Sequence, residues 1–254
     1  MIRVENLVKI FNGVKVLEDI SVSFEQGKTN LIIGRSGSGK TVLMKCIVGL
    51  HEVDEGAVYY NERNFVNMNF KERKEIRREI GMLFQGSALF DSLTVEENVM
   101  FPLNMFTQMT LEEKLERTNS CLHRVNLADI NKLYPGELSG GMKKRVAIAR
   151  AIVENPKYLL CDEPNSGLDP KTALVIDDLI SEITHEYNIT TVINTHDMNS
   201  VMEIGEKVVF IHEGRKEWEG TREEILDADN ANLNDFVFAS NFAKKIKALT
   251  SAGK

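Results

Sequence analysis

The sequence predicts an α/β fold in which helices cover a largely parallel sheet, with an antiparallel β part at the N-terminus and an inserted helical subdomain. Three observations support this prediction. Short apolar segments at 29–33, 157–161 and 190–194 are typical of buried strands. Helical patterns alternate with these strands, which favours parallel connections. Between about 70 and 130 the sequence becomes helix-rich and charged.

The elements follow from local patterns of apolar residues and from turn and capping residues. Strands are expected at 2–8, 20–24, 29–33, 57–60, 80–84, 157–161, 190–194, 207–211 and 217–219. Helices are expected at 41–50, 71–78, 143–154 and 171–187, and from Thr110, where Thr110 and Glu113 form a capping box. We expect one domain at 1–227, which contains the helical subdomain at about 86–145, and an amphipathic tail at 228–254.

Composition narrows the function classes. The chain has 254 residues, 43% hydrophobic and 27% charged, which is ordinary for a globular protein. A formal net charge of -7 argues against a general nucleic-acid binder. Cys46, Cys121 and Cys161 are widely spaced, form no CxxC pair and are expected to be reduced thiols in a cytosolic protein. The N-terminus lacks a secretory apolar segment and no run of 18 apolar residues occurs, so any membrane role requires a partner.

A glycine-rich loop follows the strand at 29–33 directly. It reads Gly34-Arg35-Ser36-Gly37-Ser38-Gly39-Lys40-Thr41 and satisfies G-x-x-x-x-G-K-[ST] between a strand and a helix. Backbone N–H groups and the helix N-terminus can then hold phosphates. Lys40 is expected to bind the β- and γ-phosphates of ATP, and the Thr41 hydroxyl is expected to bind Mg²⁺. The alternative is a chance glycine-rich turn, which the flanking strand and helix disfavour.

Two carboxylates end the apolar segment Tyr158–Cys161. Asp162 is placed to hold Mg²⁺ through water, and Glu163 is placed to polarise the attacking water as a general base. Alone, such a pair is more often a solvated strand end or a helix cap. Together with the phosphate loop, it favours catalysis.

A second possible anion site is the segment Leu138-Ser139-Gly140-Gly141-Met142, which precedes a helix. Ser139 and the amides of Gly140 and Gly141 could bind a γ-phosphate. Since Gly34–Thr41 already serve one ATP, the second set is expected to serve the ATP of a second copy. The alternative is an ordinary Ser-Gly-Gly turn with an N-cap.

Over residues 1–225 the order of these motifs resembles the ATP-binding subunits of ABC transporters. The resemblance implies a P-loop NTPase core, ATP and Mg²⁺ as cofactors, and ATP hydrolysis in an ATP-sandwiched homodimer. It gives Gln85 the role of sensing Mg²⁺ or water, and gives His196 a γ-phosphate contact, although a lone histidine after a strand is more often structural. Ser166–Asp169 resembles the loop that crosses the dimer interface. Phe11 resembles the aromatic residue that stacks on adenine, with a core phenylalanine as the alternative.

The resemblance also implies a membrane permease as partner, on the cytoplasmic face of the inner (plasma) membrane. Met142 stands where the family most often has Gln, and Asn165 where Thr or an apolar residue is common. Neither departure removes a catalytic group. The apolar, Met-rich stretch Met100–Met109 is expected in a loop-like setting and suits the permease's coupling helix, or packs in part into the core.

The cargo is a narrower question. The segment Phe84–Val99 and Met142 look like the Mla-type lipid-transport ATPases, which implies phospholipid transport, an MCE-domain partner and a small regulatory subunit. Importers of small polar solutes share much of the same segment and stay as the alternative. The tail could clasp a dimer partner or regulator, or pack on its own domain; its apolar and basic residues are Phe236, Phe238, Phe242, Lys244, Lys245, Ile246, Lys247 and Leu249.

Two other classes compete. A non-transport ABC ATPase of DNA repair, chromosome maintenance or translation would show a long coiled coil, zinc-binding cysteines or two fused cassettes, which this sequence lacks. A P-loop kinase would leave Leu138–Met142 and His196 unexplained.

Overall fold

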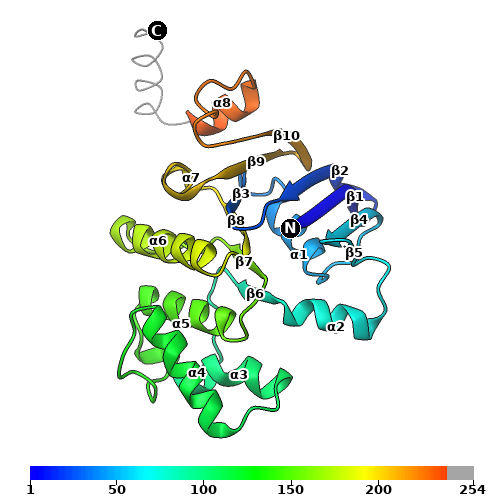
Figure 1. Ribbon diagram of the computed structural model, residues 1–254. Helices are drawn as coiled ribbons and strands as arrows, with labels where there is room; N and C mark the ends of the chain where they lie inside the picture. Colours follow the sequence, from blue (N-terminus) through cyan, green and yellow to red (C-terminus); the bar gives the residue numbers. More distant parts are fainter. Residues whose placement is uncertain (239–254) are drawn as a thin grey trace. The chain divides into compact units, whose positions relative to one another are not determined.

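The computed structural model describes residues 1–238, and Figure 1 shows the order of the elements along the chain. Contacts divide the chain into two compact units. The first unit contains residues 1–25, 29–66 and those from 194 onward. The second contains residues 26–28 and 67–193.

An antiparallel sheet forms the N-terminal part of the first unit, as predicted. Its strand order is β2-β1-β4-β5. In the central strand β1, Val4 lies opposite Val22 of β2 and Val58 of β4, so that apolar residues share one face. The strands are β1 (Ile2–Phe11), β2 (Val14–Phe24), β4 (Glu55–Tyr60) and β5 (Arg63–Asn64).

The remaining strands of the first unit are β3 (Thr29–Ile33), β9 (Lys207–His212) and β10 (Arg215–Gly220). β3 pairs in parallel with β9, and β10 adds to β9 in antiparallel fashion. Every residue of β3 is buried, as expected for a strand of a parallel sheet. The helices are α1 (Lys40–Ile47), α7 (Met198–Ile204) and α8 (Ala231–Val237).

The second unit combines parallel strands with helices. β6 (Ile80–Leu83) pairs in parallel with β7 (Tyr158–Asp162). The next strand in the sheet after β7 is β8 (Thr190–Thr195). The last two residues of β8 belong to the first unit. Helices α3, α4 and α5 pack on one another (Figure 1). The helical elements are α2 (Phe70–Arg78), α3 (Val95–Phe106), α4 (Leu111–Arg124), the 3-10 turn η1 (Pro135–Glu137), α5 (Gly140–Ile152) and α6 (Pro170–Glu186).

One prediction of local structure is wrong. Met100–Met109 was expected in a loop-like setting, but α3 continues to Phe106. A capping box of Thr94 and Glu97 begins this helix, and Pro102 inside it does not end it. Met100 and Leu103 are buried whereas Met105 is exposed, so the stretch is partly core and partly surface. Helix α7 was not expected.

Several boundaries also differ from the sequence expectations. β2 begins at Val14 rather than at residue 20, because a register shift with Asp19 at φ 53 hides its alternation. α5 begins at Gly140 rather than at residue 143, because Ser139 caps it.

The two predicted subdivisions remain predictions. The helical insertion at about 86–145 falls within the second unit but is not separated from it by contacts. Of the tail, α8 is described, whereas Phe242, Ile246 and Leu249 lie outside the described residues. In residues 1–238 no helix is long and apolar enough to cross a membrane.

Candidate active site

The phosphate loop leads from the end of β3 to the start of α1, and two of its glycines have backbone conformations that favour glycine. Gly34 has φ 149, and a Cβ there would lie 2.2 Å from the Ile211 carbonyl oxygen. Gly39 has φ 107, a conformation that is strained for any residue with a side chain. Close main-chain approach at Gly34 and the positive φ at Gly39 therefore explain the glycines in this tight loop.

The side chains of this loop suit a polyphosphate. Lys40 is buried, and its ammonium donates to the carbonyl oxygens of Gly34 (2.8 Å) and Arg35 (3.0 Å). The buried Ser38 hydroxyl has no hydrogen-bond partner within the described part of the chain. A buried hydroxyl without a partner is costly and would be satisfied by an oxyanion held in the loop. Arg35, Ser36 and Gly37 are exposed at its open side.

Two other predicted residues of the first unit are exposed. Phe11 ends β1 with 37% of its surface accessible, so it is not a core phenylalanine. Its ring makes an edge contact with His51 and lies 5.1 Å from the Lys9 ammonium. His196 is exposed and follows β8 directly. Both side chains are therefore accessible from solvent.

The two acids lie where β7 ends. Asp162 is the last residue of this strand and is buried, whereas Glu163 is half-buried. Glu163 has φ 52, in the left-handed region that costs energy for a residue with a side chain. The turn after the strand therefore holds Glu163 in a strained conformation. Such strain is concentrated at functional sites.

Gln85 and the segment after Asp162 come together within the second unit. Gln85 is exposed, and its Nε2 donates to the Ser166 hydroxyl at 3.3 Å. The unusual Asn165 is buried and donates to the Asp177 carboxylate at 2.8 Å. This bond explains why a polar residue is tolerated at position 165. Gln85, which follows β6, is thus tied to the loop that follows β7.

The Ser-Gly-Gly segment forms the N-terminus of α5. The Ser139 hydroxyl accepts from the Met142 N–H at 3.2 Å, which makes Ser139 the N-cap. Ser139 and Gly140 are exposed. A Cβ on Gly141 would lie 2.7 Å from Cγ2 of Thr172 in α6, so glycine is required there by packing. This N-cap is consistent both with a phosphate site that serves a second copy and with an ordinary Ser-Gly-Gly turn.

The sequence analysis missed two basic residues of α5 that donate hydrogen bonds to the loops after β6 and β7. Lys144 is buried, and its ammonium donates to the Gln85 and Glu163 carbonyl oxygens. Arg150 donates to the carbonyl oxygens of Ser87 (2.7 Å) and Ala88 (2.8 Å). A signal for Lys144 was present, because it lies four residues before Ile148 and eight before Ile152, on the buried face of the helix.

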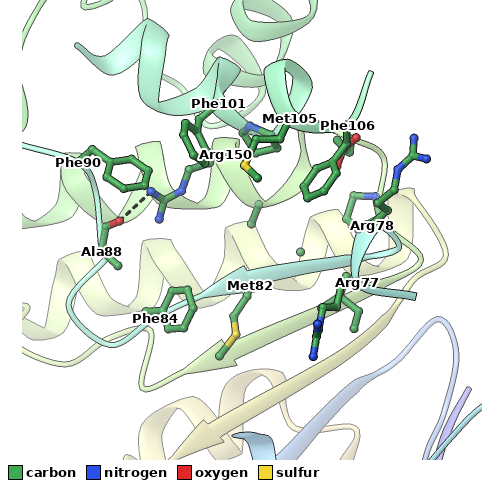
Figure 2. Close-up of a pocket in the computed structure, with 16 residues that line it drawn as sticks. Arg77, Arg78, Met82, Phe84, Ala88, Phe90, Phe101, Met105, Phe106 and Arg150 are labelled. Carbon is green, nitrogen blue, oxygen red and sulfur yellow. Dashed lines mark hydrogen bonds between the residues drawn. The ribbon is translucent and has the colours of Figure 1, made fainter. Parts of the chain in front are cut away.

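A separate pocket of about 410 Å³ lies in the second unit beside these contacts (Figure 2). Figure 2 shows Phe101, Met105 and Phe106 of α3 above Met82 and Phe84, with Arg150 joined to Ala88 at one side. The rings of Phe90 and Phe101 lie 4.8 Å apart. The pocket is mainly apolar, with cationic groups at its margin.

Asn98 of α3 holds the loop that carries Phe90. The side chain is fully buried and accepts from the Phe90 N–H at 2.8 Å. It donates to the carbonyl oxygens of Phe90 (3.1 Å), Leu93 (3.1 Å) and Thr94 (3.0 Å). One amide therefore fixes the segment between Gln85 and α3.

Comparison with known proteins decides the family. Residues 17–166 match the sequence profile described as ABC transporter. The chain belongs to the ABC transporter family. It has the family's ATPase fold, binds ATP with Mg²⁺ and hydrolyses ATP. A solved structure of the ATP-binding cassette MJ0796, dimeric and in a post-hydrolysis state with ADP and Pi, has a TM-score of 0.80 and 33% identity, covering 87% of this chain and 99% of that one.

Among sequence relatives, the methionine import ATP-binding protein MetN of Campylobacter jejuni is 39% identical, over 95% of this chain and 77% of its own length. A probable ribonucleotide transport ATP-binding protein of Mycobacterium leprae is 34% identical, over 93% of this chain and 68% of its own length. These names do not support the narrower resemblance to Mla-type lipid ATPases, nor an MCE-domain partner.

Proposed function

We propose that this ABC ATPase powers a membrane permease as one half of a homodimer in which each ATP is bound by the phosphate loop of one copy and by the Ser139–Gly141 segment of the other. The observation that carries the proposal is the exposed, Ser139-capped N-terminus of α5, a second anion-type site in a chain that already has a phosphate loop. The dimeric state of the similar cassette MJ0796 supports it.

Within each composite site we assign roles residue by residue. Gly34 to Thr41 hold the phosphates, and Lys40 moves from its carbonyl partners to the β- and γ-phosphates. Thr41, Gln85 and Asp162 bind Mg²⁺ directly or through water, and Glu163 activates the attacking water. His196 contacts the γ-phosphate and Phe11 stacks on adenine. The family's motif order supports these roles, and the exposure of Phe11, Gln85 and His196 is compatible with them.

A mixing experiment tests the shared site. Ser139→Arg blocks the segment offered to the partner's ATP, and Lys40→Ala disables the phosphate loop. Each variant alone should hydrolyse ATP poorly, whereas a mixture should regain one functional composite site per mixed dimer. Lys157→Met, a change at an exposed lysine outside the motifs, serves as the control in the same mixtures. If mixed dimers form but hydrolyse no faster than the sum of the two variants, each copy has a self-contained site.

The pocket beside α3 is where we place the permease. Its apolar wall includes Met105, which is 58% exposed, and flexible methionine suits a surface that adapts to a partner helix. Met105→Glu should abolish stimulation of ATP hydrolysis by the permease while the thermal midpoint of the isolated chain stays unchanged. Leu111→Glu, on α4 outside the pocket and 66% exposed, is the matched control and should retain stimulation. Equal loss in both variants would place the permease elsewhere.

For cargo we propose import of a small polar solute of the methionine class, with the ATPase on the cytoplasmic face of the membrane. The similarity to a methionine import protein over 95% of this chain supports this cargo. An ATPase subunit does not touch the cargo, so its sequence reports cargo only through its choice of permease. The relative named for ribonucleotide transport shows that similar cassettes carry other cargo assignments.

Phospholipid is the second candidate, favoured by the segment Phe84–Val99 and by Met142 at the end of the segment Leu138–Met142. The complex with its permease, purified from its own membrane and reconstituted in nanodiscs, separates the two. Stimulation of ATP hydrolysis by methionine, independent of lipid composition, supports solute import. Stimulation that follows phospholipid composition, with lipid bound in the partner, supports the lipid candidate and the MCE-domain and regulatory partners that accompany it.

A further inference from the structure

Lys144 is a charged side chain on the buried face of α5. Only 4% of its surface is accessible, and its neighbours on that face, Ile148 and Ile152, are apolar. A buried ammonium is costly unless its donors are satisfied. Its Nζ donates to two main-chain carbonyl oxygens, those of Gln85 and Glu163, the latter at 3.4 Å. Lys144 therefore links two loops that are 78 positions apart in the sequence.

Nearby negative charges offset part of the free-energy cost of burying the Lys144 ammonium. Burial lowers the pKa of Lys144, and the neighbouring carboxylates of Glu163 and Asp162 oppose that effect. Among the described residues of the second unit, Lys144 is the one lysine or arginine with a buried side chain, and it neighbours both Asp162 and Glu163. The ammonium is thus placed to act on the main chain rather than on solvent.

The loops that Lys144 joins are strained. Glu163 has φ 52, and Ser87 and Ala88, just after Gln85, have φ 63 and φ 47. Residues with side chains keep such conformations only where surrounding contacts hold them. Lys144 binds the carbonyl of Glu163 itself, and Arg150 of the same helix binds the carbonyls of Ser87 and Ala88. Both strained turns are therefore anchored to α5.

We propose that Lys144 is a positioning residue for ATP hydrolysis: by holding the main chain of Gln85 and Glu163 at once, it sets the positions from which their two side chains act on the attacking water and Mg²⁺. The inference rests on the roles proposed for Gln85 and Glu163. Lys144 does not touch the nucleotide. Because misplacement of a reacting group by about 1 Å can cost about 10²-fold in rate, a lost anchor should be visible in kcat.

The test uses the purified full chain and steady-state hydrolysis measured over a range of Mg-ATP concentrations up to saturation. Lys144→Met keeps the length of the side chain but removes its charge and donors, and should lower the hydrolysis rate on the order of 10–100-fold. The ATP dissociation constant and KM should change less than about threefold, because the phosphate loop is untouched. Lys144→Arg and Lys144→Gln retain donors, and at least one should recover about tenfold over the Met variant. Lys157→Met, at an exposed lysine, is the matched control.

A purely structural role for Lys144 would lower the thermal midpoint of Lys144→Met and leave the rate of the folded fraction unchanged. That result would overturn the inference, as would a rise in KM with an unchanged rate. If Lys144→Met does not fold, Lys144→Leu, which also lacks donors, is compared with Lys144→Gln, which retains them: equal rates in both overturn the inference, and a slower Leu variant supports it.

A double variant separates this inference from the proposed function. If Lys144 acts through Glu163, Lys144→Met added to Glu163→Gln should slow hydrolysis far less than it does alone, because the base is already lost. If Glu163→Gln is slow and Lys144→Met matches wild type, only the present inference fails. If Glu163→Gln hydrolyses at the wild-type rate, the assignment of the base fails, and the inference about Lys144 fails with it.

Discussion

Replacing Asn98 tests how the loop after Gln85 is held. This fully buried amide accepts from the Phe90 N–H and shares its two amide hydrogens among three main-chain carbonyls, so it makes the equivalent of three full hydrogen bonds. Leucine has a similar shape and can make none of them. At about 1 kcal/mol net for each bond, the loss is about 3 kcal/mol, while the apolar burial that leucine adds and the main-chain groups that it leaves unpaired act in opposite directions. Asn98→Leu should therefore destabilise the protein by about 3 kcal/mol.

The assay is thermal unfolding followed by circular dichroism. One kcal/mol corresponds to about 2–4 °C for a chain of this size, so the midpoint should fall by about 10 °C. Asn104→Leu is the matched control on the same helix, because Asn104 is exposed and its side chain accepts from Lys114 at the surface. Its midpoint should move by no more than about 2 °C. A shift below about 3 °C for Asn98→Leu would refute the reasoning that this amide fixes the loop.

Three further predictions concern packing, thiols and the phosphate loop. Gly141→Ala should lower the thermal midpoint, because the new methyl would lie 2.7 Å from Cγ2 of Thr172. Adding Thr172→Ser, which removes that Cγ2, should restore much of the lost midpoint. An unchanged midpoint in Gly141→Ala would show that the two helices separate freely. All three cysteines are buried, and burial raises the pKa of each thiol, that of Cys46 to about 11. Iodoacetamide at pH 8 should therefore label the native protein far more slowly than the urea-unfolded chain, as measured by mass spectrometry. Lys40→Met should weaken Mg-ATP binding by at least about tenfold in a fluorescent-nucleotide titration, and wild-type affinity would remove Lys40 from the phosphate site.

The sequence predicted those features that depend on local chemistry. The phosphate loop was predictable because its tight path needs glycine: Gly34 lies too close to main chain for a side chain, and Gly39 has a positive φ. The parallel strands at 29–33 and 157–161 followed from apolar patterns, whereas the antiparallel arrangement of the N-terminal strands followed from the family resemblance. The start of α4 at Thr110 followed from its capping box, which is present.

Other features depend on tertiary contacts that no local pattern reports. Helix α3 was taken for loop because its apolar residues and Pro102 conceal a helix that begins at the Thr94 capping box. The bonds of Lys144 to Gln85 and Glu163 join loops distant in sequence. The pairing of Asn165 with Asp177 likewise exists only in the folded chain. The charge of Lys144 on the buried face of α5 was an available signal that the sequence analysis did not use, and it would not have identified the partners of Lys144.

The central claim is that this ABC ATPase works as an ATP-sandwiched dimer with Glu163 as the base. Its most direct test is the size of the Glu163→Gln variant by gel filtration with light scattering, with and without Mg-ATP. The account predicts a monomer without nucleotide and a stable dimer with Mg-ATP, because ATP stays bound when hydrolysis is slowed by about 10²–10⁴-fold. A monomer under both conditions, with ATP binding confirmed in the same sample, would contradict it.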